Sequence, residues 1–120
     1  MVNEISGKSQ TRQQRRAQKA YGCVHGVTDK QKDYAQLAKR FPALVQACGL
    51  AQAVSFVQAK EKEIGGKYLE HLSKVIETEN DLAKASRESD LIKYQRLSRE
   101  AIEAATWLKR YADALLETES

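Results

Sequence analysis

The side chains that most clearly suggest chemistry are four cations near the start of the sequence. Residues 9–27 contain four Lys or Arg and no Asp or Glu. At about 100° per residue these cations share one side of a helix, and we call them the basic stripe: Arg12, Arg15, Arg16 and Lys19. Uncompensated cations attract polyanions, although a solvated charged surface is the more common explanation. The basic stripe is therefore the candidate contact for an RNA or DNA backbone.

The formal charge of +4 is unevenly distributed along the 120 residues. Residues 1–50 hold nine Lys and Arg against three acids, whereas residues 51–120 hold eleven against thirteen. The first half of the chain therefore carries +6 and the second half −2. Asymmetry of this kind points to a polyanionic partner for the first half.

No arrangement of residues is typical of an enzyme, and we expect no catalytic site, metal or cofactor. His25 and His71 are the only histidines. Cys23 and His25 are two positions apart, so on a helix they point about 160° away from each other and cannot chelate one metal ion. A metal site assembled in space from Cys23, Cys48 and His71 is the weaker hypothesis, because buried Cys commonly acts as a small apolar filler.

The cysteine and hydropathy patterns favour the cytoplasm. Two cysteines form no disulfide framework and suit a reducing compartment. Residues 41–57 form an uncharged stretch that includes Pro, Gly, Gln and Ser, and it is too short and too polar to span about 30 Å of hydrocarbon. No apolar run follows the first arginines, so we expect neither a secretory signal nor a membrane partner.

The same uncharged stretch is predicted to form a helix-turn-helix hairpin at the floor of the core. Pro42 fits the first position of a helix, and its ring disfavours helical geometry at the preceding residue, so a break or sharp kink is expected near Arg40. Gly49 should close this short helix. An apolar stripe then marks the second helix, and its members are Leu50, Ala53, Val54 and Val57.

Capping residues and glycines predict the other helix boundaries. Ser or Thr followed three residues later by Glu or Gln forms a capping box, and the matching pairs are Thr11 with Gln14 and Thr28 with Gln31. Gly65 and Gly66 are expected to end the second helix of the hairpin. A polar connection is expected at residues 86–90. Ser89 or Asp90 should cap a last helix that runs to residue 117 and is about 42 Å long.

The sequence thus predicts an all-α fold, a compact bundle of about five to six helices with a long C-terminal helix. Residues that favour helix are abundant, and Pro occurs once. Residues 1–10 lack periodicity and are expected to be a mobile N-terminal arm, while residues 11–120 should form a single all-helical domain. The first helix should dock on the hairpin through an apolar stripe about 120° from the basic stripe, which leaves the four cations in water. The members of the apolar stripe are Ala17, Ala20, Tyr21, Val24 and Val27.

Trp107 and the tyrosines are further candidates for contact with nucleic acid. Aromatic rings stack on bases with about 1–3 kcal/mol per base. Their helical spacing favours packing in the core or between subunits instead, so we assign them no binding role from the sequence.

An ordered set of apolar, aromatic and basic positions runs through almost the whole chain. It consists of Arg16-Ala17, Ala20, Tyr34, Pro42, Gly49-Leu50, Gln52-Ala53, Phe56, Tyr68, Leu72, Tyr94, Trp107-Leu108-Lys109-Arg110 and Ala112. In this set the sequence resembles the small helical subunit of the type III-B CRISPR RNA-guided effector, the Cmr complex. Cys23, His25 and Gly65-Gly66 match nothing in that family.

The resemblance implies a non-catalytic structural subunit of an antiviral ribonucleoprotein. Copies of the chain would stack beside other Cmr subunits and hold guide RNA paired to target RNA, while a neighbouring subunit cleaves RNA. Together with the charge pattern, this predicts RNA-backbone contacts at the basic stripe. The weaker candidates for the same contacts are Lys39, Arg40, Lys109 and Arg110.

Two other classes of protein stay open. A DNA-binding helix-turn-helix regulator presents polar and basic side chains to base edges, whereas the segment after Gly49 offers Leu, Ala, Val and Phe. A small helical adaptor outside CRISPR systems would meet an acidic protein through the basic stripe. RNA that co-purifies with the isolated complex is expected only for the ribonucleoprotein.

Overall fold

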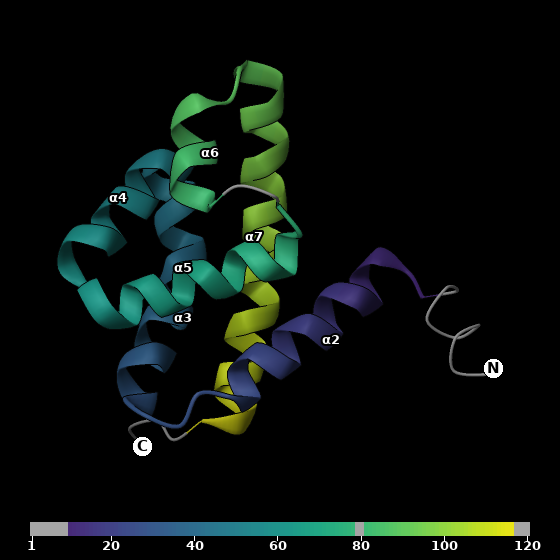
Figure 1. Cartoon of the computed structure of the whole chain (residues 1–120), viewed down its shortest axis with the longest axis vertical. Coiled ribbons are helices and arrows are strands. Elements are labelled where there is room, and N and C mark those ends of the chain that lie inside the picture. The colour runs from purple at the N-terminus through teal and green to yellow at the C-terminus, as the bar shows by residue number, and fades with distance from the viewer. Residues whose placement is uncertain (1–9, 79–80, 117–120) are drawn as a thin grey trace.

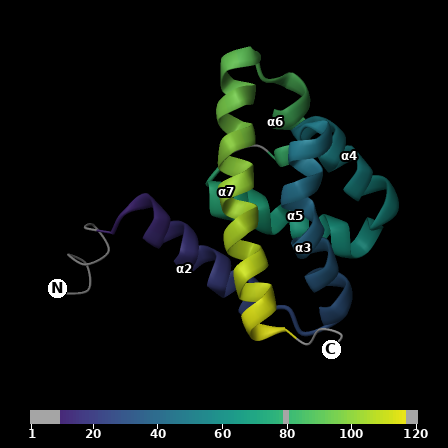
Figure 2. The same cartoon turned by 180° about the vertical axis from the view of Figure 1, so that it is seen from behind.

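The computed structural model describes residues 10–78 and 81–116, which form six helices and no strand (Figures 1 and 2). The helices are α2 (Arg12–His25), α3 (Gln31–Cys48), α4 (Leu50–Lys60), α5 (Lys62–Ile76), α6 (Leu82–Glu88) and α7 (Leu91–Leu115). This confirms the predicted all-α bundle with a long C-terminal helix. Residues 1–9 of the expected N-terminal arm lie outside the described residues. In the described ranges no helix is long and apolar enough to cross a membrane.

The longest helix, α7, is the axis of the bundle and contacts α2, α3, α5 and α6. Its 25 residues extend about 38 Å at 1.5 Å per residue. Both views show α3 beside α7 and α5 crossing the two on one side (Figures 1 and 2). On that same side α2 crosses α7, and its first turns extend beyond the bundle (Figures 1 and 2). The start of α2 is therefore open to solvent.

An aromatic cluster from α3 and α5 fills the centre of the core. The ring centroids of Tyr34 and Tyr68 are 5.6 Å apart, and those of Phe41 and Tyr68 are 5.3 Å apart. All three side chains are fully buried. The hydroxyl of Tyr34 lies 2.6 Å from Nδ1 of His71, which gives its buried polar end a partner. Burial is the main reason that the pKa of His71 is lowered to about 4, and the nearby charge of Lys74 lowers it further.

Helix α3 continues through Pro42, so of the break or sharp kink expected near Arg40, the break does not occur. Proline removes one backbone hydrogen bond inside a helix. The buried stripe of α3 nevertheless continues past it, because both Phe41 and Val45 belong to the core. Tertiary burial contributes more to helix stability than local propensity does. The helix ends at Cys48 as predicted, and Gly49 follows with φ 88°, a conformation that favours glycine.

Tyr94 of α7 fixes the start of α4. Its hydroxyl accepts a hydrogen bond from the backbone N–H of Ala51 at 3.1 Å. That N–H belongs to the first turn of α4, where a helix leaves its own donors without partners. The hairpin of α3 and α4 is therefore tied to α7 by a side chain distant in the sequence.

Two predicted helix starts are confirmed. Oγ1 of Thr11 accepts from the N–H of Gln14 at 3.1 Å, and Oε1 of Gln14 accepts from the N–H of Thr11 at 2.8 Å. Asp90 caps α7 by accepting from the N–H of Lys93 at 2.9 Å. In both cases a short side chain satisfies a donor of the first turn.

Two other predicted boundaries are wrong. The capping box at Thr28 does not form, because α3 follows Lys30, which has a left-handed φ of 55°, and no side chain caps that helix. The polar connection expected at residues 86–90 is mostly helical, since α6 extends to Glu88 and Ser86 is buried. The burial of Ser86 shows that a polar sequence does not decide a boundary when neighbouring helices pack on the segment.

Gly65 and Gly66 lie inside α5, so the prediction that they end α4 is wrong. The chain turns instead at Glu61, which separates the two helices. A Cβ on Gly65 would lie 2.8 Å from both Cγ1 and the backbone oxygen of Val57, whereas a Cβ on Gly66 would meet nothing within 4 Å. Gly65 is therefore needed for the close approach of α5 to α4.

Replacing Gly65 with Ala should destabilise the protein, and replacing Gly66 with Ala should not. The added Cβ at position 65 collides with the backbone of Val57, and overpacking of this kind typically costs about 1–3 kcal/mol. Alanine at the open position 66 should raise the free energy of unfolding by up to about 1 kcal/mol, because Ala has the higher helix propensity. Urea unfolding of both variants measures the difference, and equal stabilities would contradict the packing role of Gly65.

Stability should fall as the pH drops from about 6.5 towards about 4, because of His71. Its pKa is near 6.5 in the unfolded chain and about 4 in the folded protein, so below 6.5 the unfolded chain binds the proton more readily. Above 6.5 both states are neutral and this group adds no pH dependence. His71→Gln keeps a polar partner for Tyr34 and should show a smaller slope in urea unfolding across this range. Identical slopes would exclude His71 as the responsible group.

Candidate nucleic-acid interface

Helix α2 packs mainly against α7 and α5 through most of its predicted apolar stripe, so the expectation that it docks on the hairpin is wrong. The buried members are Ala20, Val24 and Val27. Ala17 is half-buried, and Tyr21 is 45% exposed. The expectation that Tyr21 belongs to the buried side of the helix is therefore wrong.

Arg16 departs from the rest of the basic stripe because its side chain lies in the interface between α2 and α7. The side chain is only 6% exposed, and its Nη2 lies 3.7 Å from Oε2 of Glu100. Its Nη1 is hydrogen-bonded to the carboxylate of Glu103, which also accepts from the amide of Gln13 at 3.4 Å. The expectation that all four cations lie in water is thus wrong for Arg16, which joins α2 to α7.

Arg15 and Lys19 face Glu77, the residue that ends α5. The ammonium of Lys19 donates to the carboxylate of Glu77, and Nε of Arg15 lies 3.9 Å from the same group. The hydrogen bond from Lys19 is the main reason that the pKa of Glu77 is lowered. All three side chains are more than 40% exposed. One exposed carboxylate only partly offsets two cations, since such pairs contribute little in water.

Arg12 begins α2 at the end that extends beyond the bundle (Figure 1). It is exposed, and no ion pair joins it to another residue within the described part of the chain. The first turn of α2 contains no acidic residue. A helix N-terminus carries a partial positive charge, which adds to the positive potential around Arg12.

The four weaker candidates are divided between two places. Lys39 and Arg40 are exposed on α3, and Arg40 forms a 3.0 Å ion pair with the glutamate that joins α4 to α5. That connection lies on the opposite side of the bundle from the free end of α2 (Figure 1). Lys109 and Arg110 lie on α7, which packs against α2, and the guanidinium of Arg110 lies 5.3 Å from the ring centroid of Trp107. The α7 pair therefore lies on a helix that packs directly against α2.

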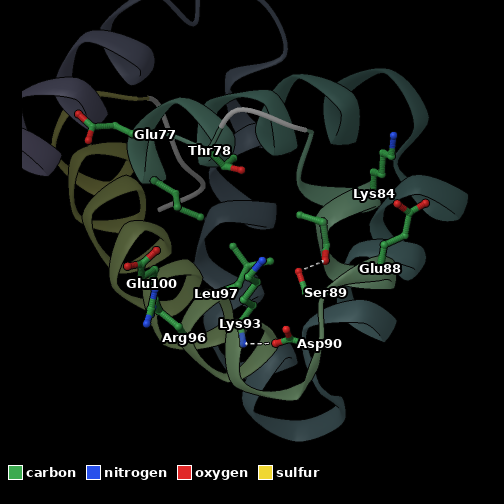
Figure 3. A pocket seen from close by; sticks show the side chains of 12 residues that line it. Glu77, Thr78, Lys84, Glu88, Ser89, Asp90, Lys93, Arg96, Leu97 and Glu100 are labelled. Atoms are coloured by element: carbon green, nitrogen blue, oxygen red, sulfur yellow. Dashed lines mark hydrogen bonds between the residues drawn. The ribbon is translucent and has the colours of Figure 1, made fainter.

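A groove of about 580 Å³ lies between the end of α5, α6 and the start of α7 (Figure 3). Its charged lining is mixed and comprises Glu77, Glu88, Asp90, Glu100, Lys84, Lys93 and Arg96. The hydroxyl of Ser89 donates to the backbone oxygen of Ala85 at 2.7 Å, and the lining that the structure describes contains no His or Cys. The groove holds no paired nucleophile and base, and its mixed charge suits a polyanion poorly.

The thiols and the buried imidazole are engaged in packing. Sγ of Cys48 lies 3.2 Å from the backbone oxygen of Leu44, and burial raises the pKa of the Cys23 thiol. Cys23 and His71 line one shallow hollow, but Cys48 does not. Within residues 10–78 and 81–116, no three His, Cys, Asp or Glu side chains lie close enough to hold a metal ion. The structure therefore does not gather the three-residue metal site considered from the sequence.

The inward position of Arg16 could have been recognised from its spacing. It lies four residues before Ala20 and eight before Val24, so it continues the buried edge of α2 as well as the charged one. Its partners Glu100 and Glu103 were not identifiable, because they belong to a helix distant in the sequence. The exposed part of the basic stripe is therefore Arg12, Arg15 and Lys19.

Comparisons with known proteins agree with this architecture. The sequence profile described as CRISPR-associated protein (Cas_Cmr5) matches residues 12–115. The chain is 40% identical over 111 residues to the CRISPR system Cmr subunit Cmr5 of Thermus thermophilus, which covers 89% of this chain and 97% of that protein. The crystal structure of a CRISPR-associated Cmr5 family protein from the same organism aligns with a TM-score of 0.82 and 40% identity over 90% of this chain and 99% of that one. The chain therefore belongs to the Cmr5 family of CRISPR-associated proteins.

Proposed function

We propose that this chain is a non-catalytic structural small subunit of a type III-B Cmr ribonucleoprotein in the cytoplasm. Copies of it stack beside other Cmr subunits and bind the backbone of the guide and target RNA during RNA-guided antiviral silencing. Family membership and the name of the Thermus relative, a Cmr subunit, support this place in a complex. The chain contributes no cofactor and no cleavage step.

The observation that carries the RNA contact is the free start of α2, where cations face water. Arg12 has no ion-pair partner among the described residues, while Arg15 and Lys19 share the single carboxylate of Glu77. Contacts to phosphate position a protein on RNA without reading sequence, and guide–target base pairing supplies the specificity. Arg16 holds α2 on α7 in this proposal. The secondary contacts are Lys39, Arg40, Lys109 and Arg110.

The orientation of α4 argues against a DNA-binding helix-turn-helix regulator. The apolar stripe of this helix is buried and consists of Leu50, Ala53, Val54 and Val57. A recognition helix must instead enter the major groove with polar and basic side chains. The RNA proposal therefore fits the exposed charges better.

Replacing Arg12, Arg15 and Lys19 together with Gln should weaken RNA binding and reduce its salt dependence. Each lost phosphate contact removes about 0.7–0.9 from the slope of log affinity against log salt, so the three should together remove about 2–3. Fluorescence anisotropy with labelled single-stranded RNA and with a guide–target duplex at several salt concentrations measures both quantities. An unchanged slope would exclude these cations as the contact. Selective binding of one DNA duplex would favour the DNA-binding alternative.

Two control variants test whether a change in the salt slope reflects the loss of phosphate contacts. The first controls for the loss of positive charge, and the second for a loss of stability. Replacing Lys84, Arg87 and Lys93 with Gln removes the same charge from exposed positions on α6 and α7, and should leave most of the slope intact. Arg16→Met should lower the free energy of unfolding by about 1–3 kcal/mol, because it leaves carboxylates in the α2–α7 interface without their partner. The folded Arg16→Met protein should keep the wild-type salt slope.

The start of α7 offers a surface for stacking between subunits. Leu91 and Ile92 are 69% and 70% exposed, more than any other large hydrophobic side chain in the described ranges. They lie at the tip where α6 turns into α7, at the end of the bundle (Figure 1). Exposed apolar side chains gathered in one place are typical of a protein interface.

Replacing Leu91 and Ile92 with Gln should reduce association between copies without lowering the stability of the single chain, because both side chains are largely in water. Sedimentation at increasing concentration and native mass spectrometry of the purified complex measure the number of copies. Leu115→Gln, at the opposite end of α7 and 40% exposed, is the matched control. An unchanged copy number in the double variant would place the stacking contact elsewhere.

A further inference from the structure

Four rings form a continuous row across the junction of α2 and α7, and we call this row the aromatic ladder: His25, Tyr21, Tyr111 and Trp107. The rings of His25 and Tyr21 stack at 5.7 Å with an interplanar angle of 23°. Tyr21 meets Tyr111 edge-on at 5.5 Å, and Tyr111 stacks on Trp107 at 5.9 Å and 19°. Contacts of this geometry each add about 0.5–1.5 kcal/mol beyond area burial, so the row is ordered.

The aromatic ladder lies at the surface, unlike the other aromatic cluster of the protein. The rings of Tyr34, Phe41 and Tyr68 are fully buried in the core. Tyr21 is 45% exposed and His25 is exposed, while Trp107 and Tyr111 are half-buried. An ordered row of rings that remains in contact with water can accept a further planar group without refolding.

A hydrogen bond and a nearby cation orient Trp107, the end of the aromatic ladder on α7. The indole Nε1 of Trp107 donates to Oε1 of Gln13 at 2.7 Å, which fixes the plane of the ring. The guanidinium of Arg110 lies 5.3 Å from the Trp107 centroid, within the range of a cation–π contact. The ring is thus preorganised beside a cation, a combination that suits an anionic ligand with flat groups.

The charges on both helices favour a polyanion next to the ladder. Helix α2 contains no acidic residue. The part of α7 that carries the ladder, residues 104–115, holds Lys109 and Arg110 against Asp113. Glu103, the nearest preceding acid on α7, is paired with Arg16. An acidic protein would also meet these charges, but it would have no need of a row of planar rings.

We propose that the aromatic ladder is a stacking platform for unpaired bases of single-stranded RNA, next to the phosphate contacts of α2. This inference rests on the RNA-binding function proposed above and adds a second kind of contact to it. Proteins that bind single strands without sequence preference combine a basic surface with rings on which bases stack. Unpaired bases are also the parts of RNA that are free to leave their own stack.

The test compares two strands of equal length and charge, one of ordinary RNA and one in which every nucleotide lacks its base. Trp107 is the only tryptophan, so its fluorescence reports directly on the ladder. The base-containing strand should bind about tenfold more tightly than the abasic strand and should quench Trp107. A double-stranded RNA should cause little quenching, because its bases are already stacked.

Tyr21→Leu removes one ring at an exposed position and should lower affinity for the base-containing strand about tenfold. Its affinity for the abasic strand and its salt slope should not change. Tyr21→Phe keeps the ring and should bind like the wild type, which separates stacking from loss of the hydroxyl. Thermal unfolding followed by circular dichroism checks that both variants are folded.

The outcomes distinguish this inference from the function on which it rests. Equal affinity for both strands with a normal salt slope would exclude base stacking on the aromatic ladder, while the proposed phosphate contacts of α2 would stand. Failure to bind either strand overturns both proposals. Loss of a neighbouring subunit from the purified complex in Tyr21→Leu, with RNA binding unchanged, also overturns the inference and assigns the ladder to protein contact.

Discussion

The ion pair between Arg16 and the carboxylates of α7 is the contact on which the arrangement of the basic surface depends. Arg16 is almost fully buried, and a buried charge without a partner costs several kcal/mol, so the guanidinium must face Glu100 and Glu103. This requirement fixes the rotation of α2 about its own axis. Lys19 then faces the end of α5, and Tyr21 faces the ring of Tyr111. The exposed cations and the aromatic ladder are both consequences of one buried contact.

Burying Arg16 divides the basic stripe into two roles. A guanidinium that two carboxylates enclose has little free donor capacity for phosphate, so it serves the fold. Arg12 and Arg15 carry the same side chain but remain in water, because Arg12 lies at the end of α2 that extends beyond the bundle and Arg15 faces the exposed carboxylate of Glu77. A count of cations in the sequence therefore overstates the number available to a polyanion.

The elements that were predictable from the sequence are those whose partners lie within a few residues. The cap at Thr11 and the cap at Asp90 each involve a backbone donor three positions away. The errors arose where a contact between distant helices decides the outcome. Pro42 carries a local penalty that burial of the neighbouring stripe overrides, and Gly65 is required by the crossing of two helices rather than by a turn. The spacing of Arg16 from Ala20 and Val24 indicates its inward side, but its partner in α7 lies 87 positions later and is not identifiable locally.

In the function proposed above, the pairing of Arg15 and Lys19 with Glu77 would make RNA binding by one copy weak, as suits a subunit that works in a stack. A phosphate that contacts these cations must displace an exposed carboxylate, whose interaction with each of them is worth about 0–1 kcal/mol. The exchange therefore yields little free energy per copy. When several copies are held side by side along one strand, each further contact is intramolecular and the small gains combine into firm binding. In the proposed assembly, such a partly neutralised surface would favour RNA that spans several copies over RNA that meets a free subunit.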